Sequence, residues 1–499
     1  MAALAACSGG GGGGDGSWLT FTPSRVTVDG YDDGVPVAFS VIARSRRTFD
    51  RVINIAVVDV DGRIDPNVRI TGDGLLYTAT LMTSPSLAAG TYEGNLRVRL
   101  CFDDPASCLQ PVDGSPWTIP YTFNIRGPDL RPLEEIAGVP SWSTDGGNAS
   151  HLPRIAASFD PGRASRRWWT LLPASSTHGF ESETIVIDAG RVFLEWGNTQ
   201  LLAFDEDGGA LLWTLALDVT ASATGVVLTG PAAAHGQVYV AALDSERVWA
   251  LDAETGHLRW TIDLPAGARP WPSSPTPYLD HLFIGYRDYS KAAAVCFAKI
   301  QPSDGALVWT ACPIGPQTLV EGVPVIRDGL LFVATTNRLV ALRTDDGSKV
   351  WDVAVAYDTM SPSAPAAVGA SLVCTRSGSA CVDVITQGVT PHVTSGWIAG
   401  STDDTVFDID KDLSFTVRAR DAVTGDQLWS VGSSSFVGPT VIVTEGLLFT
   451  GADVIDTTTH AVLPRGVLSN VESISSRGVG YYTRWVPNIG YRLEAVNLR

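Results

Sequence analysis

Five copies of one short motif, Gly-x-x-x-Trp, recur along the sequence. The copies end at Trp213, Trp260, Trp309, Trp351 and Trp429. Successive Trp residues are 47, 49, 42 and 78 positions apart. A period in the forties is typical of a β-propeller, in which each repeat forms one four-stranded sheet, or blade. We therefore expect an all-β chain built largely from such a ring.

Three of the copies also carry an Asp four residues before the Gly, as in residues 251–260, LDAETGHLRW. This order predicts a hairpin in which one strand ends near the Asp, the turn carries the Gly, and the next strand ends at the Trp. Gly suits the turn because it adopts positive φ without a steric penalty. The Trp can wedge between blades and donate its N–H to a backbone carbonyl. We assign a structural role to Asp205, Gly209, Trp213, Asp252, Gly256, Trp260, Gly305, Trp309, Gly347, Trp351, Asp421, Gly425 and Trp429.

The fuller pattern A-L-D-x-x-T-G-x-x-x-W resembles the repeat of the quinoprotein-like propellers. Residues 142–151, with Trp142, Gly146, Gly147 and His151, resemble the segment that precedes the first blade in that superfamily. The resemblance covers about residues 140–499. It implies the fold more strongly than the function, because the superfamily includes both pyrroloquinoline-quinone (PQQ) alcohol dehydrogenases and non-enzymatic BamB-like outer-membrane assembly lipoproteins.

A second signal, pairs of apolar strands around Gly or Asp, gives the number of blades. These pairs begin near Glu183, Pro231, Ser274, Gly322, Ala364, Pro391, Pro439 and Val471. We predict an eight-bladed propeller, with seven blades as the alternative. The final block ends in a third strand, so we expect residues 166–172 (RRWWTLL) to supply its fourth strand and close the ring without free sheet edges.

The region before the repeats has a different pattern. Residues 17–127 contain short alternating strands between turn signals such as Asp33-Gly34 and Asp61-Gly62, which predicts an immunoglobulin-like β-sandwich. Residues 87–123 resemble the BACON-like and Ig-like modules of bacterial surface lipoproteins, which implies a spacer or a weak ligand binder. The expected domains are a lipobox and Gly-rich tether (1–16), the sandwich (17–127), a linker (128–140) and the propeller (141–499).

Six of the seven cysteines form close pairs in sequence, and each pair flanks a turn. The pairs are Cys101/Cys108, Cys296/Cys312 and Cys374/Cys381. We predict three disulfides between neighbouring strands and an oxidising compartment. The alternative is buried free thiols in a cytosolic protein.

The seventh cysteine, Cys7, follows Leu-Ala-Ala, which resembles a bacterial lipobox. The resemblance implies lipidation of Cys7 and an extracytoplasmic protein anchored to the outer membrane. Only six residues precede Cys7, so the charged and apolar parts of a signal peptide are missing, and we expect the numbered chain to begin inside that peptide. A simple Ala-rich start is the alternative.

The candidate catalytic and metal-binding residues do not gather into a motif. No two of the seven histidines have metal-ligand spacing, and His235 and His281 fit repeated turn residues better than a metal site. Residues 408–412 (DIDKD) have carboxylates at positions 1, 3 and 5 of a calcium loop but lack the later Gly and Glu, which favours a solvated loop. We therefore predict no metal site and no catalytic residue.

The formal net charge of −18 disfavours nucleic acid and anionic lipid as partners. The sequence also lacks the adjacent cysteine pair that resemblance to the quinone dehydrogenases would require, so we predict no cofactor. We predict a non-catalytic, monomeric cell-envelope lipoprotein whose propeller is a protein-binding scaffold. Resemblance to BamB implies outer-membrane protein assembly. The alternatives are a PQQ-dependent oxidoreductase and a carbohydrate- or surface-binding protein that uses exposed Trp271, Tyr286, Tyr289 or Trp485.

Overall fold

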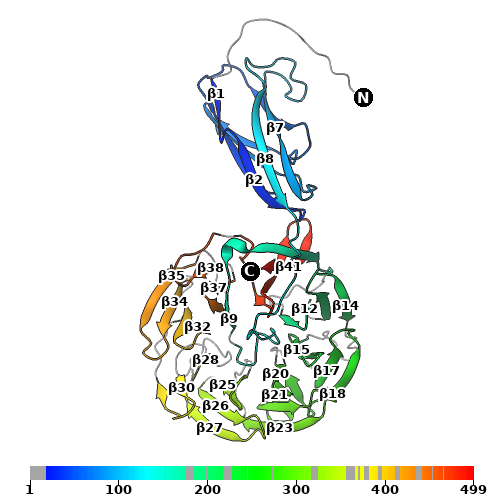
Figure 1. The fold of residues 1–499 in the computed structure, drawn as a ribbon, viewed down its shortest axis with the longest axis vertical. Coiled ribbons are helices and arrows are strands. Elements are labelled where there is room, and N and C mark those ends of the chain that lie inside the picture. The colour runs from blue at the N-terminus through cyan, green and yellow to red at the C-terminus, as the bar shows by residue number, and fades with distance from the viewer. Residues whose placement is uncertain are drawn as a thin grey trace. The chain divides into compact units, whose positions relative to one another are not determined.

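The computed structural model divides the chain into two compact units, residues 1–128 and 129–499. Figure 1 shows their strands. The structure describes residues 18–151, 153–174, 184–197, 199–216, 228–243, 245–271, 275–315, 324–335, 337–355, 366–368, 371–375, 381–390, 396–410, 416–433, 441–451, 453–464 and 466–499. The predicted lipidation site Cys7 and the tether lie outside these residues. Within them, no helix is long and apolar enough to cross a membrane.

Unit 1 is a sandwich of two four-stranded sheets. The first sheet has the order β1 (Leu19–Thr22), β3 (Ala38–Ser45), β6 (Leu76–Met82) and β5 (Arg69–Asp73). The second has the order β2 (Val26–Tyr31), β8 (Trp117–Arg126), β7 (Gly90–Cys101) and β4 (Asn54–Asp59). Alternate side chains of both sheets, such as Leu81 and Phe123, share one core. The immunoglobulin-like identity of this unit stays a prediction.

The described residues of unit 2 form eight sheets, named here sheets 1 to 8. Sheet 1 has β11 (Ile185–Asp188), β12 (Arg191–Trp196), β13 (Gln200–Asp205) and β14 (Leu211–Ala216). Sheet 2 has β15 (Ala232–Ala234), β16 (Gln237–Ala241), β17 (Arg247–Asp252) and β18 (Leu258–Asp263). Sheet 3 has β19 (Ala268–Pro270), β20 (Thr276–Tyr278), β21 (His281–Asp288), β22 (Ala294–Ile300) and β23 (Leu307–Ile314). Sheet 4 has β24 (Val325–Arg327), β25 (Leu330–Ala334), β26 (Arg338–Arg343) and β27 (Lys349–Ala354).

The remaining sheets continue the series. Sheet 5 has β28 (Ala366–Val368), β29 (Leu372–Cys374), β30 (Cys381–Asp383) and β31 (Val389–Thr390). Sheet 6 has β32 (Gly396–Ser401), β33 (Thr405–Asp410), β34 (Thr416–Asp421) and β35 (Gln427–Gly432). Sheet 7 has β36 (Ile442–Glu445), β37 (Leu447–Phe449), β38 (Val454–Asp456) and β9 (Arg154–Ser158). Sheet 8 has β39 (Ser473–Ile474), β40 (Val479–Val486), β41 (Gly490–Asn497) and β10 (Ser165–Leu171). Two 3₁₀ turns, Pro161–Arg163 and Tyr289–Lys291, complete the assignment.

These sheets are arranged as a ring, with the first strand of each repeat toward the centre (Figure 1). Strand β11 contacts both β15 and β39, so sheet 1 lies beside sheets 2 and 8. The all-β prediction is confirmed. The hairpin prediction needs one correction: the outer strands run on past the Trp, as in β18, where Trp260 is the third of six residues.

The ring is closed by strands from the beginning of unit 2. Strand β10 pairs antiparallel with β41, which confirms the closing strand predicted for residues 166–172. A second strand, β9, pairs parallel with β36 in sheet 7 and was not predicted. Sheet 7 lacks a regular outer strand in the described residues; an isolated bridge between Ile455 and Val462 stands in its place.

The structure corrects the prediction of a linker over residues 128–140. From Asp129 onward the chain belongs to unit 2. The backbone N–H of Asp129 donates to the carbonyl of Arg166, and that of Ile136 donates to the carbonyl of Ser476. Apolar Leu133 and Ile136 also pack against the core beneath sheets 8 and 1. These contacts hold residues 129–139 on the ring, which a Pro-containing polar stretch did not indicate.

Candidate binding site

The repeat residues meet at the seams between consecutive sheets. Trp213 of sheet 1 donates its Nε1–H to the carbonyl of Ala253 in sheet 2, at 3.2 Å. A Cβ built on Gly256 of sheet 2 would lie 2.7 Å from the Trp213 ring, and Gly256 has a φ of +70°. The Gly is therefore required both by the turn and by the close approach of the indole from the neighbouring sheet.

The same arrangement recurs at other seams. The Trp–Gly pairs, written in the order of the chain, are Trp168–Gly209, Trp213–Gly256, Trp260–Gly305 and Trp309–Gly347. In each pair the indole N–H donates to the carbonyl that follows the Asp position of the next repeat, namely to Glu206, Ala253, Pro302 and Thr344. Trp168, on the closing strand, was missed as a repeat residue. Its distance of 45 positions before Trp213 was the signal that could have identified it.

Two seams depart from this pattern because another residue replaces the Gly. Gln387 and His460 occupy the Gly position in sheets 5 and 7, with φ of 59° and 58°. The buried Nε1 of Trp351, in sheet 4, has no hydrogen-bond partner in the described residues. Trp429 instead stacks on the His460 ring at 4.9 Å, and no described group accepts a hydrogen bond from its Nε1. The seam between sheets 6 and 7 is therefore built differently from the standard ones.

A cavity of about 310 Å³ lies at this altered seam, and we call it the seam cavity. One wall comes from sheet 6 and the other from sheet 7, including the ring-closing strand β9. Its lining residues are Arg154, Ile155, Ala156, Thr402, Asp404, Thr405, Phe407, Trp429, Val443, Thr444, Glu445, Gly446 and Thr457. The parallel pairing of β9 with β36 shifts register after Thr444, so that Ile155 pairs with Thr444 and Ser158 with Glu445. The shift leaves Ala156 and Ala157 outside the ladder, and Ala156 lines the cavity.

The two acidic side chains of the seam cavity, Asp404 and Glu445, differ in the number of hydrogen bonds that they accept. Asp404 accepts hydrogen bonds from the hydroxyls of Thr402 (2.7 Å) and Thr405 (3.2 Å), both on Oδ1. The Thr402 bond holds the pKa of Asp404 below its usual value, so this carboxyl is ionised at neutral pH. Glu445 makes no hydrogen bond or ion pair within the described residues, and its side chain is exposed.

Arg154 completes the rim of the cavity. Its two terminal nitrogens donate to the two carboxylate oxygens of Asp403, at 2.8 and 3.1 Å. This bidentate pair joins β9 to the turn between β32 and β33 and lowers the pKa of Asp403. The rim thus carries three carboxylates, Asp403, Asp404 and Glu445, around one cation, Arg154, whose pKa is raised chiefly by its hydrogen bonds to Asp403 and also by the other two charges.

The centre of the ring is crossed by residues 141–151 and 153, drawn in blue-green in Figure 1. Backbone carbonyls of Trp142, Ser143, Ala149 and Pro153 accept from the inner strands of sheets 1, 2, 4 and 7. Thr144 donates to the carbonyl of Pro275 at the start of sheet 3. The segment therefore ties five sheets together, and its sequence resemblance reflects a structural role.

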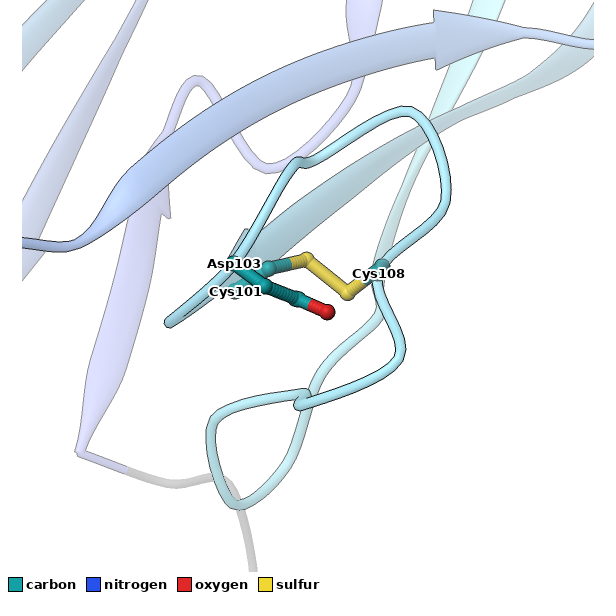
Figure 2. Close-up of side chains that lie close together, drawn as sticks. All are labelled: Cys101, Asp103 and Cys108. Atoms are coloured by element: carbon teal, nitrogen blue, oxygen red, sulfur yellow. A yellow bond between two sulfur atoms is a disulfide. The ribbon is translucent and has the colours of Figure 1, made fainter.

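The three predicted disulfides are present: Cys101–Cys108, Cys296–Cys312 and Cys374–Cys381. Figure 2 shows the first of these beside Asp103. Cysteine and carboxylate groups gather here as in a metal site, but the two sulfurs are bonded to each other. The Asp103 carboxylate accepts from the backbone N–H groups of Leu109 and Gln110. The group around Asp288, Cys296 and Cys312 is disulfide-bonded in the same way.

The described histidines do not form a cluster of metal ligands. His235, with a positive φ, contacts the Leu279 carbonyl of the next sheet through Nε2 at 3.0 Å, so it acts as a turn residue. His151 is buried in the central segment, where its ring nitrogens contact the Asp145 carbonyl and the Thr276 hydroxyl. His178 and His392 lie outside the described residues.

The structure corrects part of the prediction that residues 408–412 form a solvated loop. Residues 405–410 form strand β33, and Asp408 is fully buried. Its carboxylate pairs with Arg418 at 3.5 Å and with Arg420 on the neighbouring strand. The register of β33 and β34 explains these pairs, because Arg418 lies directly opposite Asp408 and Arg420 is two residues further along β34. Asp412 lies outside the described residues.

The four aromatics proposed for surface binding separate into two groups. Trp271 and Tyr286 are buried, at 3% and 0% exposure. Tyr289 and Trp485 are exposed, at 59% and 56%. Trp485 packs beside Tyr491 of the closing sheet, with ring centroids 5.0 Å apart. These residues therefore do not form one binding surface.

Comparison with known proteins identifies the ring. A family profile described as outer membrane protein assembly factor BamB matches residues 154–311 and 297–388. A europium-containing methanol dehydrogenase superposes with a TM-score of 0.52 at 14% identity, covering 72% of this chain and 98% of the other. Residues 154–388 resemble the repeats of that family, and the ring has the β-propeller fold. A quinohemoprotein alcohol dehydrogenase from Comamonas testosteroni gives the propeller a TM-score of 0.55 at 15% identity, covering 72% of this chain and 80% of the other.

BamB from Moraxella catarrhalis is also similar, with a TM-score of 0.47, 17% identity, and coverage of 67% of this chain and 99% of the other. No curated protein matches the sequence. At these identities the structural likeness concerns the fold of the propeller, which enzymes and non-enzymes share.

A quinone cofactor, which the fold family implies, does not fit the residues present. Cys296–Cys312 and Cys374–Cys381 join neighbouring strands as predicted, whereas Cys101–Cys108 joins the end of β7 to the loop after it. The sequence has no adjacent cysteine pair. Within the described residues, both groups with metal-ligand spacing contain a disulfide. We therefore derive no redox step for this propeller.

Proposed function

We propose that this protein is a non-catalytic lipoprotein of the cell envelope whose propeller is a scaffold for a protein partner. The observation that carries the proposal is the use of the repeat residues. Trp213 and Gly256, and their counterparts, lock consecutive sheets together and leave no repeated reactive group directed at a substrate. Such a ring offers a rigid support for loops, which suits binding rather than chemistry.

Two further observations support an envelope location. The family profile that matches part of the propeller carries the description of an outer-membrane protein assembly factor. The three disulfides, including Cys296–Cys312, require an oxidising compartment to persist. We propose that lipid on Cys7 anchors the protein to the outer membrane, and that its partner belongs to the machinery that assembles outer-membrane proteins.

The proposal is tested by a cross-linked pull-down from native outer membranes with the lipidated protein. A Cys7→Ser variant is the matched control, because it keeps every described residue and removes only the attachment site. We expect barrel-assembly components to be recovered with the lipidated protein and to be lost or strongly reduced with the variant. Recovery of a redox carrier instead, together with saturable binding of PQQ, would overturn the scaffold in favour of an oxidoreductase.

A further inference from the structure

The seam cavity holds hydrogen-bonding groups of both kinds without partners. Trp429 lines the cavity, and its Nε1–H has no acceptor in the described residues. Trp429 is half-buried, whereas Trp351 is buried. Glu445 offers carboxylate oxygens without a donor, and Asp404 uses only Oδ1 for its two threonines. A ligand in this cavity must therefore both accept and donate hydrogen bonds.

This requirement excludes two simple ligand classes. An ammonium group donates but cannot accept, so it would leave the Trp429 N–H unpaired. A phosphate accepts but, when ionised, does not donate to Glu445 and Asp404. Arg154 is the one basic residue in the lining and is already paired with Asp403, so the carboxylates outnumber it and repel an anion. A hydroxyl group does both, and neighbouring hydroxyls on a ring present several such groups at once.

The cavity has an apolar surface and a polar rim, as a ligand with a hydroxylated ring would require. The buried side chains of Phe407, Val443 and Ile155 form an apolar floor, and the exposed Glu445 and Asp404 stand at the rim. Sugar rings have apolar faces and polar edges, so this division matches them. The volume of about 310 Å³ lies at the lower end of small-molecule sites and suits one or two sugar rings.

We propose that the seam cavity binds a neutral saccharide of one or two rings, with the Trp429 N–H donating to a hydroxyl and with Glu445 and Asp404 accepting from others. At the standard seams the Trp ring packs directly against the Gly of the next sheet, whereas at this seam Trp429 stacks on the His460 ring. Strand β9 supplies one wall of the cavity. The inference goes beyond the scaffold function and does not depend on it.

The test is isothermal titration of the full chain at pH 7 with glucose, N-acetylglucosamine, maltose and chitobiose, and separately with cadaverine and inorganic phosphate. We expect at least one of the four sugars to bind with a stoichiometry of one. Trp429→Phe removes the indole N–H but keeps an aromatic ring against His460, and Glu445→Gln removes an acceptor. Each is expected to weaken binding at least about tenfold, since a site built to hydrogen-bond a hydroxyl loses strongly when a partner is missing.

Two control variants should leave sugar binding unchanged. Trp213→Phe removes an indole N–H at a standard seam, and Asp328→Asn removes an exposed carboxylate from the corresponding turn of sheet 4. In a ¹⁵N spectrum the sugar should shift the Trp429 indole signal, which is assigned by its absence in the Trp429→Phe protein.

Failure of all four sugars to bind, binding of cadaverine or phosphate in their place, or equal affinities in the Trp429→Phe, Glu445→Gln and control proteins would overturn the proposal. The envelope scaffold is tested separately by the pull-down. Recovery of assembly components by a Glu445→Gln protein that no longer binds sugar would leave the scaffold standing and show two independent sites.

Discussion

Trp213 and Gly256 form one packing unit although they belong to different sheets: a Cβ on Gly256 would lie 2.7 Å from the indole of Trp213. We expect Gly256→Ala to destabilise the protein by about 3 kcal/mol, of which about 1 comes from the left-handed backbone and the rest from overpacking. Urea unfolding followed by fluorescence measures this loss. Gly236→Ala is the control, since Gly236 has the same φ of +70° but nothing within 4 Å. Equal losses in the two variants would show that the indole contact is unimportant.

The standard and altered seams should respond differently to loss of an indole N–H. Trp260 donates to the Pro302 carbonyl at 2.7 Å, and the side-chain amide of Gln237 donates to the same carbonyl at 3.0 Å. Trp260→Phe therefore removes one of two hydrogen bonds and should cost about 0.5–1.5 kcal/mol beyond the change in packing. Trp351→Phe removes a buried donor that has no partner in the described residues, so that penalty should be absent. Both variants are compared by urea unfolding. A greater loss in Trp351→Phe than in Trp260→Phe would contradict this account of the seams.

The closing sheet contains a fully buried carboxylate, Glu494. It accepts from the Tyr482 hydroxyl at 2.7 Å and pairs with Arg166 and Arg484, both at 3.3 Å. Glu494→Gln should destabilise the ring by about 3–5 kcal/mol, because it leaves buried positive charge uncompensated. Asp263→Asn, which breaks the exposed pair with Arg247, should cost less than about 1 kcal/mol. Thermal unfolding of the two variants distinguishes these outcomes, and similar melting temperatures would count against the closing-sheet pairing.

Acid should weaken the turn at Asp456. The backbone N–H groups of Thr459 and Thr458 donate to this carboxylate and lower its pKa. Because the folded-state pKa is depressed, its stabilising effect is complete above the unfolded value, about 4, and is lost as the pH falls through the folded value. We expect Asp456→Asn to melt below the wild type at pH 7 and the gap to shrink below pH 4. Melting curves between pH 3 and 7 test this, and a constant gap would show that ionisation of Asp456 is irrelevant.

The parts of the fold that could be predicted from sequence are those encoded by local or periodic patterns. The Gly-x-x-x-Trp repeat indicated the ring, and cysteines such as Cys374 and Cys381 lie opposite each other because a hairpin separates them. The closing strand could be predicted because the last block of the repeat was one strand short. Each of these inferences needed only neighbours in sequence or a constant spacing.

The candidate site could not be predicted, because it arises from contacts between distant segments. Arg154 meets Asp403 and Val443 only when the ring is formed, and no spacing in the chain links them. His460 lies four residues after Asp456, where the repeat has Gly, but no Trp follows it at the repeat spacing to mark the position. The cavity depends both on His460 in place of the repeat Gly and on strand β9. Neither feature alone would have indicated it from the sequence.

The pairing of β9 and β10 with strands more than 280 residues later fixes an order of assembly. When the ribosome has produced sheets 1 to 6, residues 154–171 are already present but the strands that receive them, β36 and β41, are not yet made. During that interval both segments remain as unpaired edges, and sheet 1 has no neighbour on its sheet 8 side. Completion of the ring therefore has to wait until residues 479–497 have been synthesised, and a chaperone that shields the two early segments would act before that point.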